Sequence, residues 1–186
     1  VNGLANELMP RVNSAAAING MALTALCLLA SKTQTMSKTE LAQAMRDYLA
    51  LFELAPYSAN ATLPKDDADA LLDHTLSLKR LQVSEDNYGT LISPLPDNAV
   101  FLTYYRNNII HLFALPGLVM TAIFAHGKLE KNNILQLIAA LYPLLQRELF
   151  LHLSQDEALA YTAQLIDAFK QTGMLQQKGR YLALPE

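Results

Sequence analysis

The sequence predicts a mainly α-helical protein that also contains two small β-hairpins. Hydrophobic residues make up 52% of the 186 residues, which is enough to bury one good core, or two small cores that share an interface. Most apolar residues recur at three- and four-residue spacing, which is typical of amphipathic helices. Two short segments instead carry turn residues between strand-forming residues, as hairpins do. We therefore expect a compact helical domain with two hairpins.

Composition and charge exclude several classes of protein. The formal net charge of −3 gives no general attraction to phosphate backbones, so nucleic acid is not an expected partner. Cys27 is the only cysteine and lies in an apolar run, which excludes a disulfide framework and predicts a buried, reduced thiol in a cytosolic protein. No uninterrupted apolar stretch approaches the roughly 20 residues that a membrane-spanning helix needs. We therefore expect a fragment that is soluble by itself.

Two helices are predicted at the start of the chain. Residues 1–12 lack a signal pattern and resemble the interior of a longer amphipathic element, so we expect a fragment of a larger protein. Asn13 or Ser14 is expected to cap a largely buried helix that continues to Ala30. Ser37 and Glu40 have the spacing of a capping box, and the helix that they begin should end before Pro56.

A third helix and the first hairpin follow. Asp66 can cap a helix that carries Leu71 and Leu72. Residues 81–92 then place Asn87 and Gly89 between strand-forming residues, which predicts a hairpin.

The second half of the chain has a similar layout. Asp97 is expected to cap a helix that reaches Leu115, and a short helix should follow to about Ala125. Residues 125–133 are expected to form a turn before a helix over residues 134–151. Ser154 and Glu157 form a second capping box, and its helix should end near Gly173 before a second hairpin at residues 174–184.

The two halves, about 14–95 and 97–184, contain a possible repeat. Leu71, Leu72, Asp73, Leu81 and Gln82 have counterparts with identical spacing, which are Leu165, Ile166, Asp167, Leu175 and Gln176. A structural repeat and a chance match are both open at this point. If the repeat is real, each half resembles a winged helix. The third predicted helix and the residues before it carry four aspartates rather than basic residues, so we expect a packing unit rather than a DNA-binding module.

The sequence contains none of the usual signatures of a catalytic or metal site. The glycines form neither a phosphate-binding loop nor a dinucleotide fingerprint, and we expect no cofactor. The four histidines lack the spacing of metal ligands, so we expect no metal site. His152 and Asp156 are four residues apart and could form an acid–base pair, although Ser154 predicts a helix start between them.

The strongest anomaly is the segment of residues 103–119, which places polar side chains inside an apolar stretch. On one continuous helix, four of them would share one arc: Tyr104, Asn107, Asn108 and His111. Arg106 would lie nearly opposite and would need a carboxylate or an anionic ligand, because an unpaired buried charge is costly. Its partner could be Asp97 or Glu148, in a structural role, or the phosphate of a ligand.

Three blocks of the sequence resemble a known family. Residues 104–113 read YYRNNIIHLF, with VFLT before them and LPGLV after them. This block resembles the C-terminal signature of membrane-associated glycerol-3-phosphate acyltransferases, the type shared with the mitochondrial and dihydroxyacetone-phosphate acyltransferases. Residues 1–23 and 140–175 resemble other parts of the same C-terminal region. The resemblance spans essentially the whole chain.

The resemblance implies an enzyme that transfers a fatty acyl group from acyl-carrier protein or coenzyme A to glycerol 3-phosphate, giving lysophosphatidate. Such enzymes use a His-x-x-x-x-Asp motif, in which the histidine acts as general base. This chain lacks the motif, because the residues five positions after its histidines are Lys79, Pro116, Lys131 and Glu157. The resemblance therefore implies a non-catalytic C-terminal domain over residues 1–186, inactive alone, with the catalytic domain upstream.

The resemblance also carries over a set of candidate substrate-binding residues, although no catalytic ones. They are Tyr104, Tyr105, Arg106, Asn107, Asn108 and His111. The expected partners are the upstream catalytic domain, the two substrates and the membrane surface, at the cytoplasmic face of the inner membrane. Two roles are open: the domain packs on the catalytic domain and supports it, or it contributes to substrate binding through the Tyr-Tyr-Arg-Asn-Asn helix. An independent winged-helix binding module is the least favoured alternative.

Overall fold

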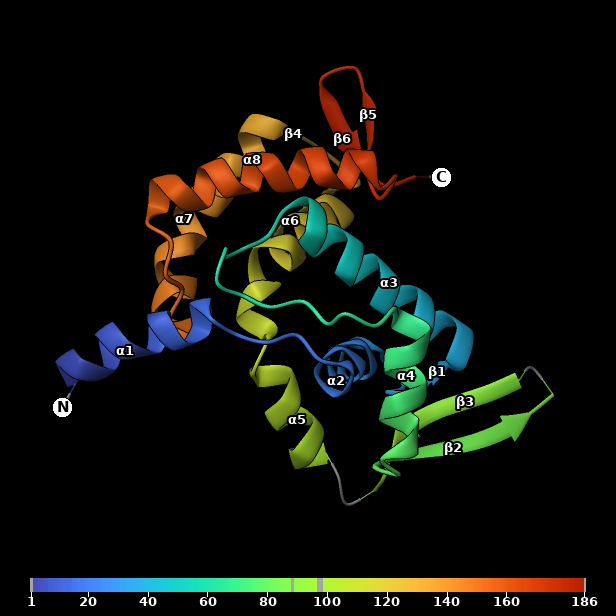
Figure 1. Ribbon diagram of the computed structural model, residues 1–186. Coiled ribbons are helices and arrows are strands. Elements are labelled where there is room, and N and C mark those ends of the chain that lie inside the picture. The colour runs from blue at the N-terminus through green and yellow to red at the C-terminus, as the bar shows by residue number, and fades with distance from the viewer. Residues whose placement is uncertain (1, 88, 97–98, 186) are drawn as a thin grey trace. The chain divides into compact units, whose positions relative to one another are not determined.

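The computed structural model describes residues 2–87, 89–96 and 99–185, and within these ranges the chain is mainly helical (Figure 1). The helices are α1 (Asn2–Ser14), α2 (Gly20–Ala30), α3 (Lys38–Leu54), α4 (Ala68–Ser77), α5 (Ala99–Asn107), the 3-10 helix η1 (Ile110–Leu112), α6 (Ala114–His126), α7 (Lys131–Leu149) and α8 (Gln155–Gln171). The strands are β1 (Met36–Ser37), β2 (Leu81–Asp86), β3 (Gly89–Pro94), β4 (Lys128–Glu130), β5 (Gln176–Lys178) and β6 (Tyr181–Ala183). The predicted helical fold with two hairpins is confirmed.

Six elements occur twice in the same order, as a helix, a strand, two helices and a hairpin. The first set is α2, β1, α3, α4, β2 and β3, and the second is α6, β4, α7, α8, β5 and β6. In each set the last strand lies in the middle of a three-stranded antiparallel sheet, with the orders β1-β3-β2 and β4-β6-β5. Leu71 and Leu165 are both buried in the last helix of their set. The arrangement fits two winged-helix-like units.

The chain forms two compact units whose boundaries differ from the expected halves. Unit 2 comprises residues 16–50 and 61–110, and unit 1 comprises residues 1–15, 51–60 and 111–186. The largest difference concerns α5, which was expected in the second half but belongs to unit 2, where it packs against α2. The apolar surface of α2 extends all around the helix, so both α4 and α5 can pack against it.

The core of unit 2 is built around α2. Every residue from Gly20 to Leu28 is buried. The helix begins beside α4, and a Cβ atom added at Gly20 would lie 2.5 Å from Thr75 Oγ1 and 2.8 Å from the Leu71 carbonyl oxygen. The absence of a side chain at Gly20 therefore allows α2 and α4 to approach closely.

The expected helix from Asn13 or Ser14 to Ala30 is wrong, because the chain is extended between α1 and α2. Ile18 N donates a hydrogen bond of 2.9 Å to the Thr62 carbonyl oxygen, and Thr62 N donates one of 3.0 Å to Ala16 O. Asn19 caps α2 instead, since its Oδ1 accepts a hydrogen bond from Ala22 N at 3.0 Å. A pairing with a distant part of the chain thus overrides the local helical pattern.

Both predicted capping boxes are confirmed. Ser37 N donates to Glu40 Oε2 at 3.1 Å, and Glu40 N donates to Ser37 Oγ at 3.2 Å. Ser154 and Glu157 make the equivalent pair of bonds at the start of α8, at 2.7 and 3.3 Å. The cap of α4 is Asp67 rather than Asp66, because Asp67 Oδ1 is the oxygen that accepts from Ala70 N.

The connection expected over residues 125–133 contains regular structure. Strand β4 occupies its middle and pairs with β6, and α7 begins at Lys131 rather than near residue 134. The two predicted hairpins are confirmed as β2–β3 and β5–β6, and Figure 1 shows β2 and β3 as the longer pair. The strands β1 and β4 escaped prediction because two or three residues carry too little periodicity.

Candidate functional site

The Tyr-Tyr-Arg-Asn-Asn segment ends a helix rather than lying in the middle of one. Helix α5 ends at Asn107, and Asn108 N donates to the carbonyl oxygens of Tyr104 and Tyr105 at 3.3 and 3.2 Å. The expected helix through Leu115 is therefore wrong, because consecutive asparagines favour a turn over a further helical residue. Its expected cap, Asp97, lies outside the described residues. Pro116 lies in the first turn of α6, where its missing N–H is tolerated.

An aromatic cluster lies on α5. Tyr104 is 63% exposed, and its ring centroid lies 5.5 Å from that of Tyr105. The ring centroid of Phe101 also lies 4.7 Å from that of Tyr105, and the Arg80 guanidinium lies 5.7 Å from the Phe101 centroid. Tyrosine and arginine are the residue types that dominate binding energy at protein interfaces, so this surface can engage a partner.

Arg106 is half-buried and its side chain folds back on its neighbour. Its Nε and Nη2 atoms donate to Asn107 Oδ1 at 3.2 and 3.0 Å. Within the described part of the chain, Nη1 donates to no acceptor. Glu148 belongs to the other unit, and Asp97 is outside the described residues. A carboxylate partner for Arg106 thus stays a prediction, while one edge of the guanidinium has the donors that a phosphate requires.

His111 belongs to unit 1, whereas the other candidate residues belong to unit 2. Only 3% of it is exposed, and its Nε2 donates to the Asn13 carbonyl oxygen at 2.7 Å. Asn13 Nδ2 in turn donates to Leu149 O at 2.9 Å, so the two bonds tie α1 to η1 and α7. Burial lowers the pKa of His111 below its ordinary value, which favours the neutral ring. These contacts give His111 a structural role.

The structure thus brings together part of the candidate set. Tyr104, Tyr105, Arg106 and Asn107 lie on the last two turns of α5, and Asn108 continues directly from them. The shared arc expected for Tyr104, Asn107, Asn108 and His111 is wrong, because the helix does not extend to His111.

A second cluster, in unit 1, was missed in the sequence. The Tyr57 ring makes edge contacts with His111, His152 and Tyr161, at centroid distances of 6.4, 4.7 and 5.7 Å. The His152 backbone N–H donates to the Tyr57 hydroxyl at 3.3 Å. Burial is the main reason why the pKa of Tyr57 is raised to about 12. Nothing in the local pattern around Tyr57 marks this cluster, because its partners are distant in sequence.

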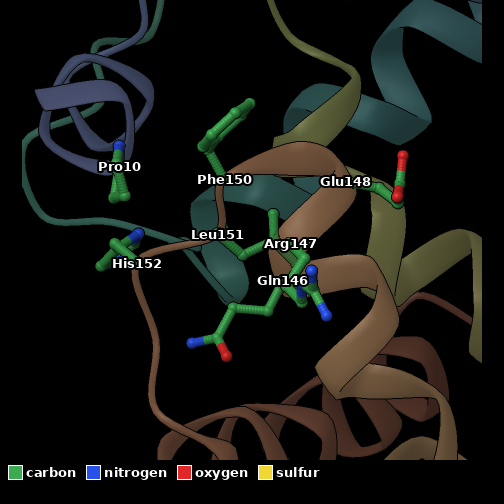
Figure 2. Close-up of a pocket in the computed structure, with 7 residues that line it drawn as sticks. All are labelled: Pro10, Gln146, Arg147, Glu148, Phe150, Leu151 and His152. Atoms are coloured by element: carbon green, nitrogen blue, oxygen red, sulfur yellow. The ribbon is translucent and has the colours of Figure 1, made fainter. Parts of the chain in front are cut away.

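His152 also lines a cavity of about 550 Å³ at the C-terminal end of α7 (Figure 2). The lining residues are Pro10, Gln146, Arg147, Glu148, Phe150, Leu151 and His152. His152 Nδ1 is buried and has no hydrogen-bond partner within the described ranges. Burial lowers the pKa of His152, and the charge of Glu157 acts in the opposite direction. Asp156, which could have formed an acid–base pair with His152, makes no ion pair with it in the described part of the chain.

The cavity is not suited to an anion. Arg147 supplies one positive charge, but Glu148 supplies a negative charge next to it. The cavity also lies where the last carbonyl groups of α7 concentrate partial negative charge. It therefore offers no evident place for a substrate phosphate.

The described residues contain no group of three or more His, Cys, Asp or Glu side chains that could hold a metal ion. Of the described helices, none combines the length and the apolar character needed to cross a bilayer.

Comparisons with known proteins identify the family. The family described as "Glycerol-3-phosphate acyltransferase C-terminal region" matches residues 1–185. Proteins named glycerol-3-phosphate acyltransferase are similar along the chain. The one from Alteromonas mediterranea is 61% identical over 186 residues, which are 100% of this chain and 23% of the relative. The one from Pseudoalteromonas atlantica is 49% identical over 185 residues, 100% of this chain and 23% of the relative. The one from Aeromonas hydrophila is 43% identical over 168 residues, 90% of this chain and 20% of the relative.

The chain thus spans about a quarter of the length of the relatives that it matches. The family match covers nearly every residue, and the Tyr-Tyr-Arg-Asn-Asn segment lies within it. The chain belongs to the family of glycerol-3-phosphate acyltransferase C-terminal regions.

Proposed function

We propose that this chain is the non-catalytic C-terminal part of a glycerol-3-phosphate 1-O-acyltransferase. The whole enzyme would transfer an acyl group from acyl-carrier protein or coenzyme A to the first hydroxyl of glycerol 3-phosphate, giving lysophosphatidate for phospholipid synthesis. It would act as a peripheral protein at the cytoplasmic face of the inner membrane. The C-terminal part would pack on the upstream catalytic domain and support it.

One observation carries this proposal: the whole of this chain matches acyltransferases, and the match covers only 23% of the length of those relatives. The sequence adds that a His-x-x-x-x-Asp motif is absent from all 186 residues. This absence supports the proposal that the general base and its orienting carboxylate come from another part of the enzyme. The chain would then support the catalytic domain rather than carry the chemistry.

The first test compares the acyltransferase activity of the full-length enzyme with that of the 186-residue chain alone. The full-length enzyme is expected to transfer acyl groups to glycerol 3-phosphate, and the 186-residue chain alone is expected to show none. Product from the chain alone, at a rate above that of a heat-denatured sample, would contradict the assignment of catalysis to the upstream part.

A second candidate role is direct substrate binding by α5. Arg106 is the observation that favours it, since its Nη1 donates to no acceptor in the described ranges. A guanidinium with a free edge can bind a phosphate group with two parallel hydrogen bonds.

The test of this role is Arg106→Gln in the full-length enzyme, assayed with glycerol 3-phosphate. Loss of a charged hydrogen bond to substrate predicts a rise in KM of roughly 10- to 100-fold with unchanged kcat. Arg46→Gln is the matched control, because Arg46 forms an exposed ion pair with Asp69 and its loss should change neither constant. Unchanged KM together with a lowered melting temperature for Arg106→Gln would assign Arg106 a structural role instead.

An independent winged-helix module that binds nucleic acid is not favoured. In unit 2 the acidic residues around α4 serve the fold: Asp67 caps α4, Asp69 pairs with Arg46, and Asp73 pairs with Lys38 at 2.7 Å. A helix with this charge would repel a phosphate backbone.

A further inference from the structure

Helix α1 exposes large apolar side chains along one side. The exposed fractions are 63% for Leu4, 47% for Leu8, 62% for Val12 and 38% for Met9. At about 100° per residue, Leu4, Leu8 and Val12 fall within an arc of about 80°, and Met9 borders it. We name these four residues the α1 stripe. Amphipathic helices of folded proteins normally bury such an arc.

The opposite side of α1 makes the contacts with unit 1. Asn13 donates to Leu149 O at 2.9 Å and accepts from His111 through its own carbonyl oxygen. Pro10 faces the cavity and lies close to His152 (Figure 2). Within unit 1, the C-terminal end of α1 meets α7, and its N-terminal part extends away from it (Figure 1). The polar and proline side is thus attached, while the apolar side is exposed.

The charges of α1 favour a protein surface over a lipid surface. Glu7 and Arg11 are the charged residues of α1, so the helix has no net charge. Helices that bind at membrane surfaces are typically rich in lysine and arginine on their polar side. A contiguous exposed apolar patch without that basic character is typical of a protein–protein contact.

The length of the relatives indicates which partner the α1 stripe contacts. This chain is a C-terminal region, and it covers only 23% of the matched acyltransferases, so most of the enzyme of the proposed function precedes it. Helix α1 is the first element of the chain and therefore the closest in sequence to that part. We propose that the α1 stripe docks on an apolar surface of the polypeptide that precedes this chain in the full-length acyltransferase. This inference rests on the proposed function and adds the surface through which the contact is made.

The test is photo-cross-linking in the purified full-length enzyme, reconstituted with phospholipid vesicles. Leu4, Leu8 and Val12 are replaced one at a time by p-benzoylphenylalanine, which is a bulky apolar residue and suits an exposed position. Val83 on β2 is the matched control, because it is apolar and 49% exposed. After irradiation, mass spectrometry of the peptides identifies what each position has captured, and retained acyl transfer shows that each variant is folded.

The expected result is an intramolecular cross-link from each stripe position to peptides of the preceding polypeptide. The control position Val83 should give no such cross-link. Cross-links to a second copy, adducts with phospholipid, or no product from all three positions would each overturn the proposal. A second readout is thermal unfolding: Leu8→Gln should lower the melting temperature of the full-length enzyme, and Val83→Gln should not. Absence of acyl transfer by the unsubstituted enzyme would refute the proposed function separately, because the cross-link map does not depend on catalysis.

Discussion

The close approach of α2 and α4 leaves no room for a side chain at Gly20. A methyl group at this position would lie 2.5 Å from Thr75 Oγ1 and 2.8 Å from Leu71 O. Both distances are well below van der Waals contact, and the carbonyl belongs to the backbone of α4, so it cannot rotate away. Thr75 is itself held by a 2.7 Å hydrogen bond to the same carbonyl. Gly20→Ala should therefore push the two helices apart.

The magnitude follows from the cost of overpacking. An added methyl group in a close-packed core typically costs about 1–3 kcal/mol. The gain from replacing glycine in a helix, about 0.5–1 kcal/mol, is small here because Gly20 is the first residue of α2. We expect a net loss of roughly 1–3 kcal/mol, which for a protein of this size lowers the melting temperature by about 3–9 °C.

The assay is thermal and denaturant-induced unfolding of the 186-residue chain. Gly117→Ala in α6 is the matched control, since a Cβ there meets nothing within 4 Å and the change should be neutral or stabilising. Gly20→Ala combined with Thr75→Ala should recover only part of the loss, because the Leu71 carbonyl contact remains. Equal stability of Gly20→Ala and the parent chain, or equal losses at Gly20 and Gly117, would refute the reasoning.

Three further predictions concern single groups. The Cys27 thiol is buried, which raises its pKa to about 12, so it should resist thiol reagents at neutral pH until the protein unfolds; rapid labelling of the native chain would contradict this. Burial lowers the pKa of His111 below its ordinary value of 6.5. As the pH falls through about 6.5, the unfolded state therefore binds a proton at His111 that the folded state does not bind. The free energy of unfolding should consequently decrease as the pH falls. His111→Gln should weaken this dependence in unfolding measured from pH 7.5 to 5, and an unchanged slope would exclude His111 as its source. Ser154→Ala removes one half of the capping box with Glu157 and should cost about 1 kcal/mol of unfolding free energy. Ser77→Ala should cost less, because the exposed Ser77 hydroxyl at the end of α4 bonds only the His74 carbonyl oxygen and caps no helix N-terminus.

Elements with strong local signals could be predicted from the sequence. The capping boxes at Ser37 and Ser154 fixed the starts of two helices, because side chain and backbone interact within four residues. The hairpins could be predicted for the same reason, because their turn residues and strands are neighbours in the sequence. The extended segment that contains Ala17 was missed because its partner, Thr62, is 45 positions away, and an apolar stretch of that kind looks helical in isolation.

The same contrast applies to the candidate site. Arg106 and Tyr104 could be selected because polar residues in an apolar stretch stand out in the sequence. The end of α5 at Asn107 was missed although consecutive asparagines favour a turn, because the apolar residues that follow them favour a continuous helix to Leu115. The contacts of Tyr57 with His152 join residues that are 95 positions apart in the sequence. Helix and strand periodicity relate only neighbouring residues, so they could not reveal these contacts.

The discontinuous composition of the two units has a consequence for synthesis on the ribosome. All of unit 2 has been translated once residue 110 is made, whereas unit 1 needs residues 1–15 together with residues 111–186. Chains are made at about 5–20 residues per second, and domains generally fold as they are completed. Unit 2 can therefore fold seconds before unit 1. During this interval α1 has been synthesised but lacks α7, to which Asn13 attaches it. Nascent chains that are stalled between these two points should contain a folded unit 2 and an α1 whose Asn13 has not yet bonded to α7.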